Sequence, residues 1–235
     1  MNRKKHDKKT ILFIILIPVV LSVIVFLCVR HKASTAFHYE DNLDTVVITV
    51  DDASVTLREF GYYIYDTEAF VQQQALLYNP QDPCDWWNTH FSAGAESTFV
   101  CDYAQKVAAD TCICNEIYCK EALRLGISLE PEEKIAAAAE AKDIYNNMSA
   151  KQREVTGLTE SKITEIKTKQ ALSAKYAGIL AKTANFAGYA KEPQALLNWD
   201  GEYYRDKILP QHTVTENSDI LDNLTFGKIT VNRVD

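Results

Sequence analysis

The strongest constraint on the fold is an uncharged apolar run near the N-terminus, residues 11–29. In a helix this run extends about 28 Å, close to the thickness of the hydrocarbon core of a bilayer. Five basic residues and one acidic residue precede it, which predicts a cytoplasmic N-terminus by the positive-inside rule. We therefore expect a cytoplasmic tail at 1–10, a single-pass anchor in the cell membrane at 11–29, and an extracytoplasmic remainder.

A cleaved signal peptide is the alternative interpretation of this run. Residues 34–36 are small enough for a peptidase site. The length of the run and the basic residues at 30–32 argue instead for an anchor that is retained in the bilayer.

The charge of the chain is divided unevenly between its two parts. Residues 1–32 contain seven basic residues and one acidic residue, a net charge of +6, whereas the whole chain carries −7. The remaining 203 residues therefore carry about −13. Because affinity for nucleic acid comes mainly from clustered Lys and Arg side chains, this balance argues against a nucleic-acid partner.

The part after the membrane run is long enough for one domain, which we place at 45–235 behind a linker at 30–44. The β-branched run 46–50, followed by Asp51 and Asp52, predicts a strand and a turn. The comparable run at 227–231 is its expected partner, so that a two-stranded sheet joins the domain's ends. The same pairing with a second copy would make a swapped homodimer.

Helical periodicity dominates between these two strands, so the predicted fold class is mainly α. Thr56 and Thr159 are typical N-cap residues, and Gly126 is a typical helix terminator. We expect a transmembrane helix followed by a domain of four to five helices, at 57–78, 95–125, 128–148, 159–182 and, more weakly, 194–208.

The order of these elements resembles the N-terminal domain of SurA/PrsA-type chaperones, membrane-associated or periplasmic foldases that hold secreted proteins as they emerge. Four segments carry the resemblance, at 47–64, 121–133, 162–180 and near Ile229. Many members of that family carry a parvulin-type isomerase domain after the fourth helix. Here only 52 residues follow Thr183, too few for such a domain.

The resemblance therefore implies a non-catalytic, chaperone-like domain that needs no cofactor and binds unfolded or extended exported polypeptides. A structural module that binds one folded partner in an extracytoplasmic membrane complex is the alternative. A thiol-dependent enzyme is a third hypothesis, and thiol titration would test it.

Aromatic side chains are the candidate client-binding residues, because they offer a large contact area at a low cost in rotamer entropy. The alternative is that Trp86, Trp87 and Phe91 simply complete the core. The candidates are Tyr62, Tyr63, Tyr65, Phe70, Trp86, Trp87 and Phe91.

Four of the cysteines fall in the second predicted helix. Cys112 and Cys114, two positions apart, point in different directions, and Cys112 and Cys119 lie about 10 Å apart along the axis, so these cysteines cannot pair with one another. Only Cys84 lies elsewhere in the domain. Cys84 and Cys101 are therefore the candidate disulfide pair, and buried free thiols are expected for the others. We predict no metal site, because His90 and His212 stand alone.

Overall fold

The computed structural model describes residues 37–93 and 96–233. The predicted tail at 1–10, the anchor at 11–29 and residues 30–36 of the linker lie outside the described residues. No helix within the described part is both long and apolar enough to cross a membrane. Residues Tyr39–Asp235 form one compact unit.

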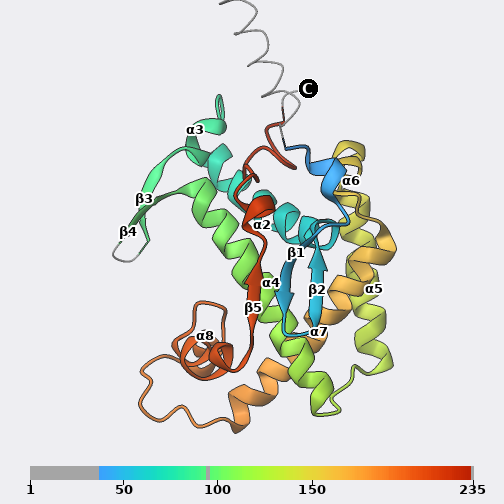
Figure 1. The fold of residues 1–235 in the computed structure, drawn as a ribbon, viewed down its shortest axis with the longest axis vertical. Helices are drawn as coiled ribbons and strands as arrows, with labels where there is room; N and C mark the ends of the chain where they lie inside the picture. The colour runs from blue at the N-terminus through green and yellow to red at the C-terminus, as the bar shows by residue number, and fades with distance from the viewer. Residues whose placement is uncertain (1–36, 94–95, 234–235) are drawn as a thin grey trace, which may run out of the picture. The chain divides into compact units, whose positions relative to one another are not determined.

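Four long helices form the body of the domain and confirm its mainly helical class (Figure 1). Thr56 caps the first of them by accepting a hydrogen bond from the backbone N–H of Glu59, and Thr159 caps the last in the same way from Lys162. Gly126, at a φ of +70°, follows the second. The helices are α2 (Leu57–Tyr78), α4 (Val100–Arg124), α5 (Pro131–Asn147) and α7 (Glu160–Thr183).

These helices pack around α4 and α7. Helix α7 lies against both α4 and α5, and α2 crosses α4. Phe60 and Ile64 on α2, Ile117 on α4, and Ile163 and Ile166 on α7 are fully buried. Because Phe60 and Ile64 are four positions apart and Ile163 and Ile166 three, α2 and α7 each turn an apolar face to the shared core.

The first sheet has three strands in the order β2-β1-β5. Strand β1 (Val46–Val50) was predicted correctly and ends in a turn where Asp51 adopts a φ of +54°. It pairs antiparallel with β2 (Ala53–Thr56) and with β5 (Val214–Glu216). The C-terminal region thus supplies a partner for β1, as expected. The prediction that segment 227–231 forms this partner is wrong, and the sheet has three strands instead of two.

Segment 227–231 forms turns and bends instead of a strand. Gly227 has a φ of +88°, which is incompatible with an extended strand. Backbone N–H groups of Gly227, Ile229 and Thr230 donate to the carboxylate of Glu68 on α2, which replaces the ladder of a sheet. We call residues 226–232 the C-terminal strap.

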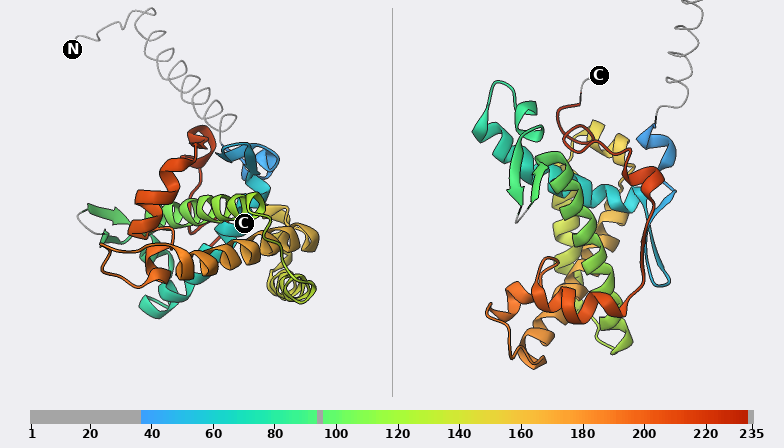
Figure 2. Two further views of the ribbon diagram at one scale, coloured as in Figure 1. Left: turned by 90° about the horizontal axis from the view of Figure 1, so that it is seen from below. Right: turned by 60° about the vertical axis from the view of Figure 1, so that its left-hand side comes forward.

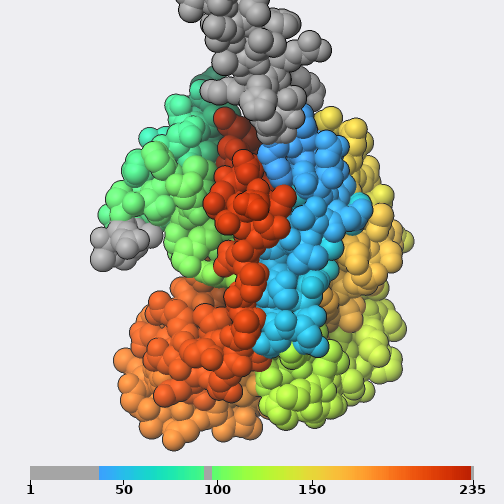
Figure 3. All heavy atoms as spheres, in the orientation of Figure 1, coloured from blue at the N-terminus to red at the C-terminus, as the bar shows by residue number. Residues whose placement is uncertain are grey.

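The strap is held on its other sides as well. Gln72 and Asn232 exchange two side-chain hydrogen bonds of 2.8 Å, and Gln152 Nε2 donates to the carbonyl of Thr230 at 3.0 Å. Figure 3 shows the C-terminal segment as a red band beside the blue segment that contains β1 and β2.

A β-hairpin stands to one side of α4, where we predicted a loop and the start of the second helix (Figures 1 and 2). It consists of β3 (His90–Ala93) and β4 (Glu96–Phe99), and the short helix α3 (Cys84–Trp87) precedes it. Helix α4 therefore begins at Val100 and not near residue 95.

The predicted fifth helix at 194–208 is divided into two short helical pieces at its two ends, with Gly201 between them. A Cβ at Gly201 would lie 2.2 Å from the carbonyl oxygen of Leu196, so the close approach of the chain at this point requires glycine. The short elements of the domain are η1 (Tyr39–Asn42), α6 (Ala150–Thr156), α8 (Pro193–Leu196), the π-helical η2 (Tyr204–Ile208), η3 (Leu209–Gln211) and α9 (Ser218–Leu221).

Candidate functional site

An apolar groove lies where α2, α3, β3 and the first turns of α4 meet. Its volume is about 290 Å³. Among the residues that the structure describes, no charged side chain lines it. The lining side chains are Thr67, Phe70, Val71 and Gln74 from α2, Trp86 from α3, Phe91 from β3, and Val100, Tyr103, Ala104 and Val107 from α4.

Helical spacing explains why α2 and α4 each contribute several side chains to the groove. On both helices the lining residues follow one another by three, one and three positions, so they form one stripe along the helix surface. The stripe on α2 lies in its second half, beyond the fully buried Phe60 and Ile64. Thr67, Val71 and Gln74 continue the stripe of Phe60 and Ile64, so one face of α2 packs in the core in its first half and lines the groove in its second.

Trp86 is positioned by the loop that follows α2. The Asn79 side chain accepts hydrogen bonds from the backbone N–H groups of Gln81 and Asp82 and donates to the carboxylate of Asp85. Trp87 is anchored beside it, because its Nε1–H donates to Gln72 at 2.9 Å. With α3 fixed in this way, the ring of Trp86 contacts Tyr78 at a centroid separation of 4.9 Å.

Exposed apolar side chains lie beside this groove, and a second group, Leu123, Leu125 and Ile135, lies around the end of α4 and the start of α5. Phe70 is 66% exposed, Leu77 80% and Tyr78 60%, all on the second half of α2. Across the groove, Phe91 packs edge-on against Tyr103 with centroids 5.1 Å apart. Large apolar patches on a surface commonly mark binding sites for other molecules.

The structure separates the seven aromatic candidates into two groups. Phe70, Trp86 and Phe91 line the groove. Tyr62, Tyr63 and Trp87 are each only 3% exposed and belong to the core, and Tyr65 is half-buried and does not line the groove. The candidate client-binding set therefore keeps Phe70, Trp86 and Phe91.

Sequence reasoning missed the contribution of α4 to the groove. Val100, Tyr103 and Val107 repeat at helical spacing, which predicts the helix but not what its stripe faces. The periodicity was correct, but a helix stripe has the same pattern whether it faces a core or a groove. The β3–β4 hairpin carries Phe91 over α4, where it forms one wall of the groove.

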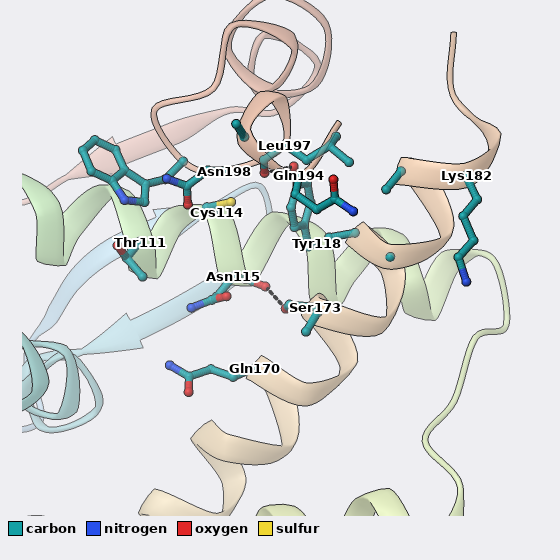
Figure 4. Close-up of a pocket in the computed structure, with 16 residues that line it drawn as sticks. Thr111, Cys114, Asn115, Tyr118, Gln170, Ser173, Lys182, Gln194, Leu197 and Asn198 are labelled. Atoms are coloured by element: carbon teal, nitrogen blue, oxygen red, sulfur yellow. Dashed lines mark hydrogen bonds between the residues drawn. The ribbon is translucent and has the colours of Figure 1, made fainter. Parts of the chain in front are cut away.

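A larger pocket of about 710 Å³ lies further along α4, between α4, α7 and the segment that contains α8 (Figure 4). Polar side chains from all three walls reach it, among them Asn115, Gln170 and Gln194. Ser173 at its edge donates a hydrogen bond of 2.6 Å to the carbonyl of Asn115, which joins α7 to α4. Lys182 points away from the other residues labelled in Figure 4.

Two clusters of charged side chains are satisfied internally. Lys169 pairs with Glu59 at 2.7 Å and Glu116 at 2.8 Å. Burial favours the neutral amine of Lys169, but its hydrogen bonds with the two glutamates outweigh this effect and raise its pKa. Asp51 accepts a hydrogen bond of 2.8 Å from His212, which holds the pKa of Asp51 well below its usual range.

Neither cluster has the composition of a metal centre. Within residues 37–93 and 96–233, no group of three or more His, Cys, Asp or Glu side chains is placed to hold a metal ion. The clusters join separate elements instead, since Lys169 links α7 to α2 and α4, and His212 links the approach to β5 with the turn after β1.

The five cysteines of the described part are free thiols in the structure. Cys84 and Cys101 are half-buried and not bonded to each other, so the disulfide that we predicted is not formed here. Burial raises the pKa of Cys114 to about 12 and that of Cys112 well above its ordinary value. Such thiols are poor nucleophiles at neutral pH.

Comparison with known proteins finds no relative. The chain matches no family model, and no curated protein and no solved structure is significantly similar to it. The resemblance to SurA/PrsA-type chaperones therefore stays a prediction from the order of the sequence elements.

Proposed function

We propose that the protein is a membrane-anchored, non-catalytic, chaperone-like domain that binds unfolded or extended exported polypeptides on the extracytoplasmic side of the membrane. The observation that supports this function best is the exposed apolar groove with Phe70, Trp86 and Phe91 in its walls. The anchor at 11–29 would keep the groove close to the membrane from which such polypeptides emerge.

The chemistry of the groove suits apolar segments of varied sequence. Its lining holds no charged side chain that would require a specific counter-charge, and its aromatic rings can contact side chains of many shapes. Such segments are buried in folded proteins and exposed in unfolded ones. A groove of this kind therefore distinguishes unfolded from folded chains.

Charge complementarity narrows the expected client further. Asp85 adjoins Trp86 and Asp102 adjoins Tyr103 in the sequence, and both aspartates are exposed. The outer part of the chain also carries a net charge of about −13. The preferred client is thus an extended apolar segment with basic residues on its flanks.

Removal of the two most prominent aromatic groups tests this function. The Phe70→Ala, Trp86→Ala double variant should weaken binding of an unstructured apolar peptide by about tenfold, since truncation of buried aromatic anchors commonly costs 1–2 kcal/mol or more. Leu123→Ala is the matched control, because Leu123 is 64% exposed at the far end of α4. Fluorescence anisotropy of a labelled peptide measures the change, with circular dichroism to verify folding.

Two results would contradict the proposal. A folded wild-type protein that neither delays aggregation of an unfolded client nor cross-links to it does not act as a chaperone. A single stoichiometric partner in pull-downs, with no preference for unfolded chains, would instead indicate the scaffolding module.

A further inference from the structure

The apolar groove and the larger pocket are lined by the same face of α4. Each lining residue on this helix follows the previous one by three, four or one positions, so that all of them fall on one stripe. The stripe consists of Val100, Tyr103, Ala104 and Val107 in the groove and Thr111, Cys114, Asn115 and Tyr118 in the pocket.

The neighbouring elements continue from one concavity to the other. Val107 in the groove and Thr111 in the pocket are one helical turn apart. On α2, Thr67 lines the groove, and Tyr63, one turn earlier, accepts a hydrogen bond of 3.5 Å from Asn115 of the pocket. The β3–β4 hairpin and the segment around α8 project to the same side of α4 (Figures 1 and 2).

The pocket differs from the groove in its chemistry. No carboxylate of the described part of the chain lines it, although the domain is strongly acidic, and four of its side chains are amides, namely Asn115, Gln170, Gln194 and Asn198. The side chains of Thr111, Gln194 and Trp199 also line it, and they form no hydrogen bond with other residues that the structure describes. Asn115, Gln170 and Asn198 each already form a side-chain hydrogen bond, with Tyr63, Lys167 and Asp200 respectively, which uses only part of their capacity. Together with Gln194 and Thr111 they offer further uncharged donors and acceptors to a ligand.

An extended main chain matches this arrangement. Each residue of a polypeptide presents one N–H donor and one C=O acceptor whatever its side chain. Amide side chains can bond both groups. The wall that α7 contributes is low, because Ala174, Ala177, Gly178 and Ala181 lie in it, and a Cβ added to Gly178 would meet no atom within 4 Å.

We propose that the groove and the pocket are one trough that binds a single extended polypeptide segment, with apolar side chains in the groove and the main chain held by the amides of the pocket. This inference rests on the proposed function. Val100 and Tyr118 are about 27 Å apart along the helix axis, and an extended segment of that length contains about eight residues.

A substitution that fills the pocket and leaves the groove unchanged tests the trough. Gly178→Leu places a side chain in open space, and leucine favours a helix interior more than glycine does. Ser161→Leu is the matched control, since Ser161 is exposed on α7 and does not line the pocket. The full-length chain in lipid nanodiscs is titrated with two labelled peptides. The short peptide has four apolar residues, and the long peptide has ten residues, the same four followed by six chosen from Ser, Asn and Gln.

The trough predicts that the ten-residue peptide binds wild-type protein more tightly than the short one. The Gly178→Leu substitution should reduce the affinity for the long peptide by about tenfold and leave the affinity for the short peptide unchanged. The Phe70→Ala substitution should reduce the affinity for both peptides, and the Ser161→Leu substitution should change neither affinity.

Equal binding of the long peptide by Gly178→Leu and by wild type would overturn the trough, and the proposed function would stand if both peptides still bind. Long and short peptides of equal affinity for the wild-type protein would overturn it in the same way. Failure of the folded wild type to bind either peptide would overturn the proposed function itself.

Discussion

Glu68 is the residue on which the C-terminal strap depends. Its side chain is fully buried on α2 and accepts hydrogen bonds from three backbone N–H groups and from the Thr230 hydroxyl, at 2.5 to 3.2 Å. Glu68→Gln places an NH₂ group where an acceptor is needed, so buried donors lose their partner. We expect a loss of about 1–3 kcal/mol in the free energy of unfolding, measured by urea denaturation.

Glu154→Gln is the control for this substitution, because Glu154 makes only an exposed contact of 3.5 Å with Lys151. It should change stability by less than about 0.5 kcal/mol. Hydrogen exchange of the strap amides gives a second measurement. Unchanged protection of Gly227 and Thr230 in the Glu68→Gln variant would show that the carboxylate does not hold the strap.

The same carboxyl group makes stability depend on pH. Burial raises the pKa of Glu68 above 4.5, although its hydrogen bonds counteract this effect. The folded state therefore keeps the proton at pH values where the unfolded state has released it. The stability of wild type relative to Glu68→Gln should be largest below about pH 4.5 and should decrease as the pH rises through the folded pKa. Denaturation curves at several pH values test this, and an increase with pH would contradict it.

Thiol reactivity tests the burial of the cysteines. In a Cys28→Ser background, Cys84 and Cys101 should react with Ellman's reagent at pH 8, because they are only half-buried. Cys101 should react more slowly than an unhindered thiol, since burial and Asp102 raise its pKa. The three buried thiols should react only after unfolding. Reaction of more than two thiols in the folded protein would contradict the structure. If no thiol of the folded protein reacts until a reductant is added, the Cys84–Cys101 disulfide is present.

At the scale of elements, the contact between Gly227 and Trp87 joins the strap to α3. A Cβ on Gly227 would lie 2.4 Å from an atom of the Trp87 ring. Gly227→Ala combines this clash with the strain of a positive φ, and we expect a loss of about 3 kcal/mol. Thermal unfolding measures the loss of stability.

Gly188→Ala separates the two effects. Gly188 has a similar φ of +94°, but a Cβ there would meet nothing within 4 Å. Only the backbone strain remains, about 1 kcal/mol. Equal destabilisation by the two variants would show that Trp87 does not press on Gly227, and α3 would then be held without the strap.

At the scale of the whole molecule, net charge should select among apolar clients. A peptide with an apolar centre and Lys flanks should bind about five times more tightly than the same peptide with Glu flanks at low ionic strength. The difference should fall below about twofold at 0.5 M salt, where charges are screened within a few ångströms. Equal binding of both peptides at low salt would show that the acidic surface plays no part.

The long elements were predictable because their signals are local. Thr56, Thr159 and Gly126 mark helix ends through their own hydrogen bonds or backbone angles, and β-branched residues favour β1 within five positions. The segment 227–231 was mispredicted because its composition favours a strand, whereas a buried acceptor from another helix, Glu68, bonds its N–H groups. The hairpin at 90–99 was missed because its strands are short.

The sequence alone determined the helical class of this protein, the positions of its long helices and the stripe of apolar residues along α4, because these depend on spacing within a few turns of chain. Only the tertiary structure decided which aromatic residues are buried and which line the groove. Phe70 and Tyr62 lie on the same helix, yet one is 66% exposed and the other 3%. Exposure depends on what packs against each face, and the packed elements come from distant parts of the chain.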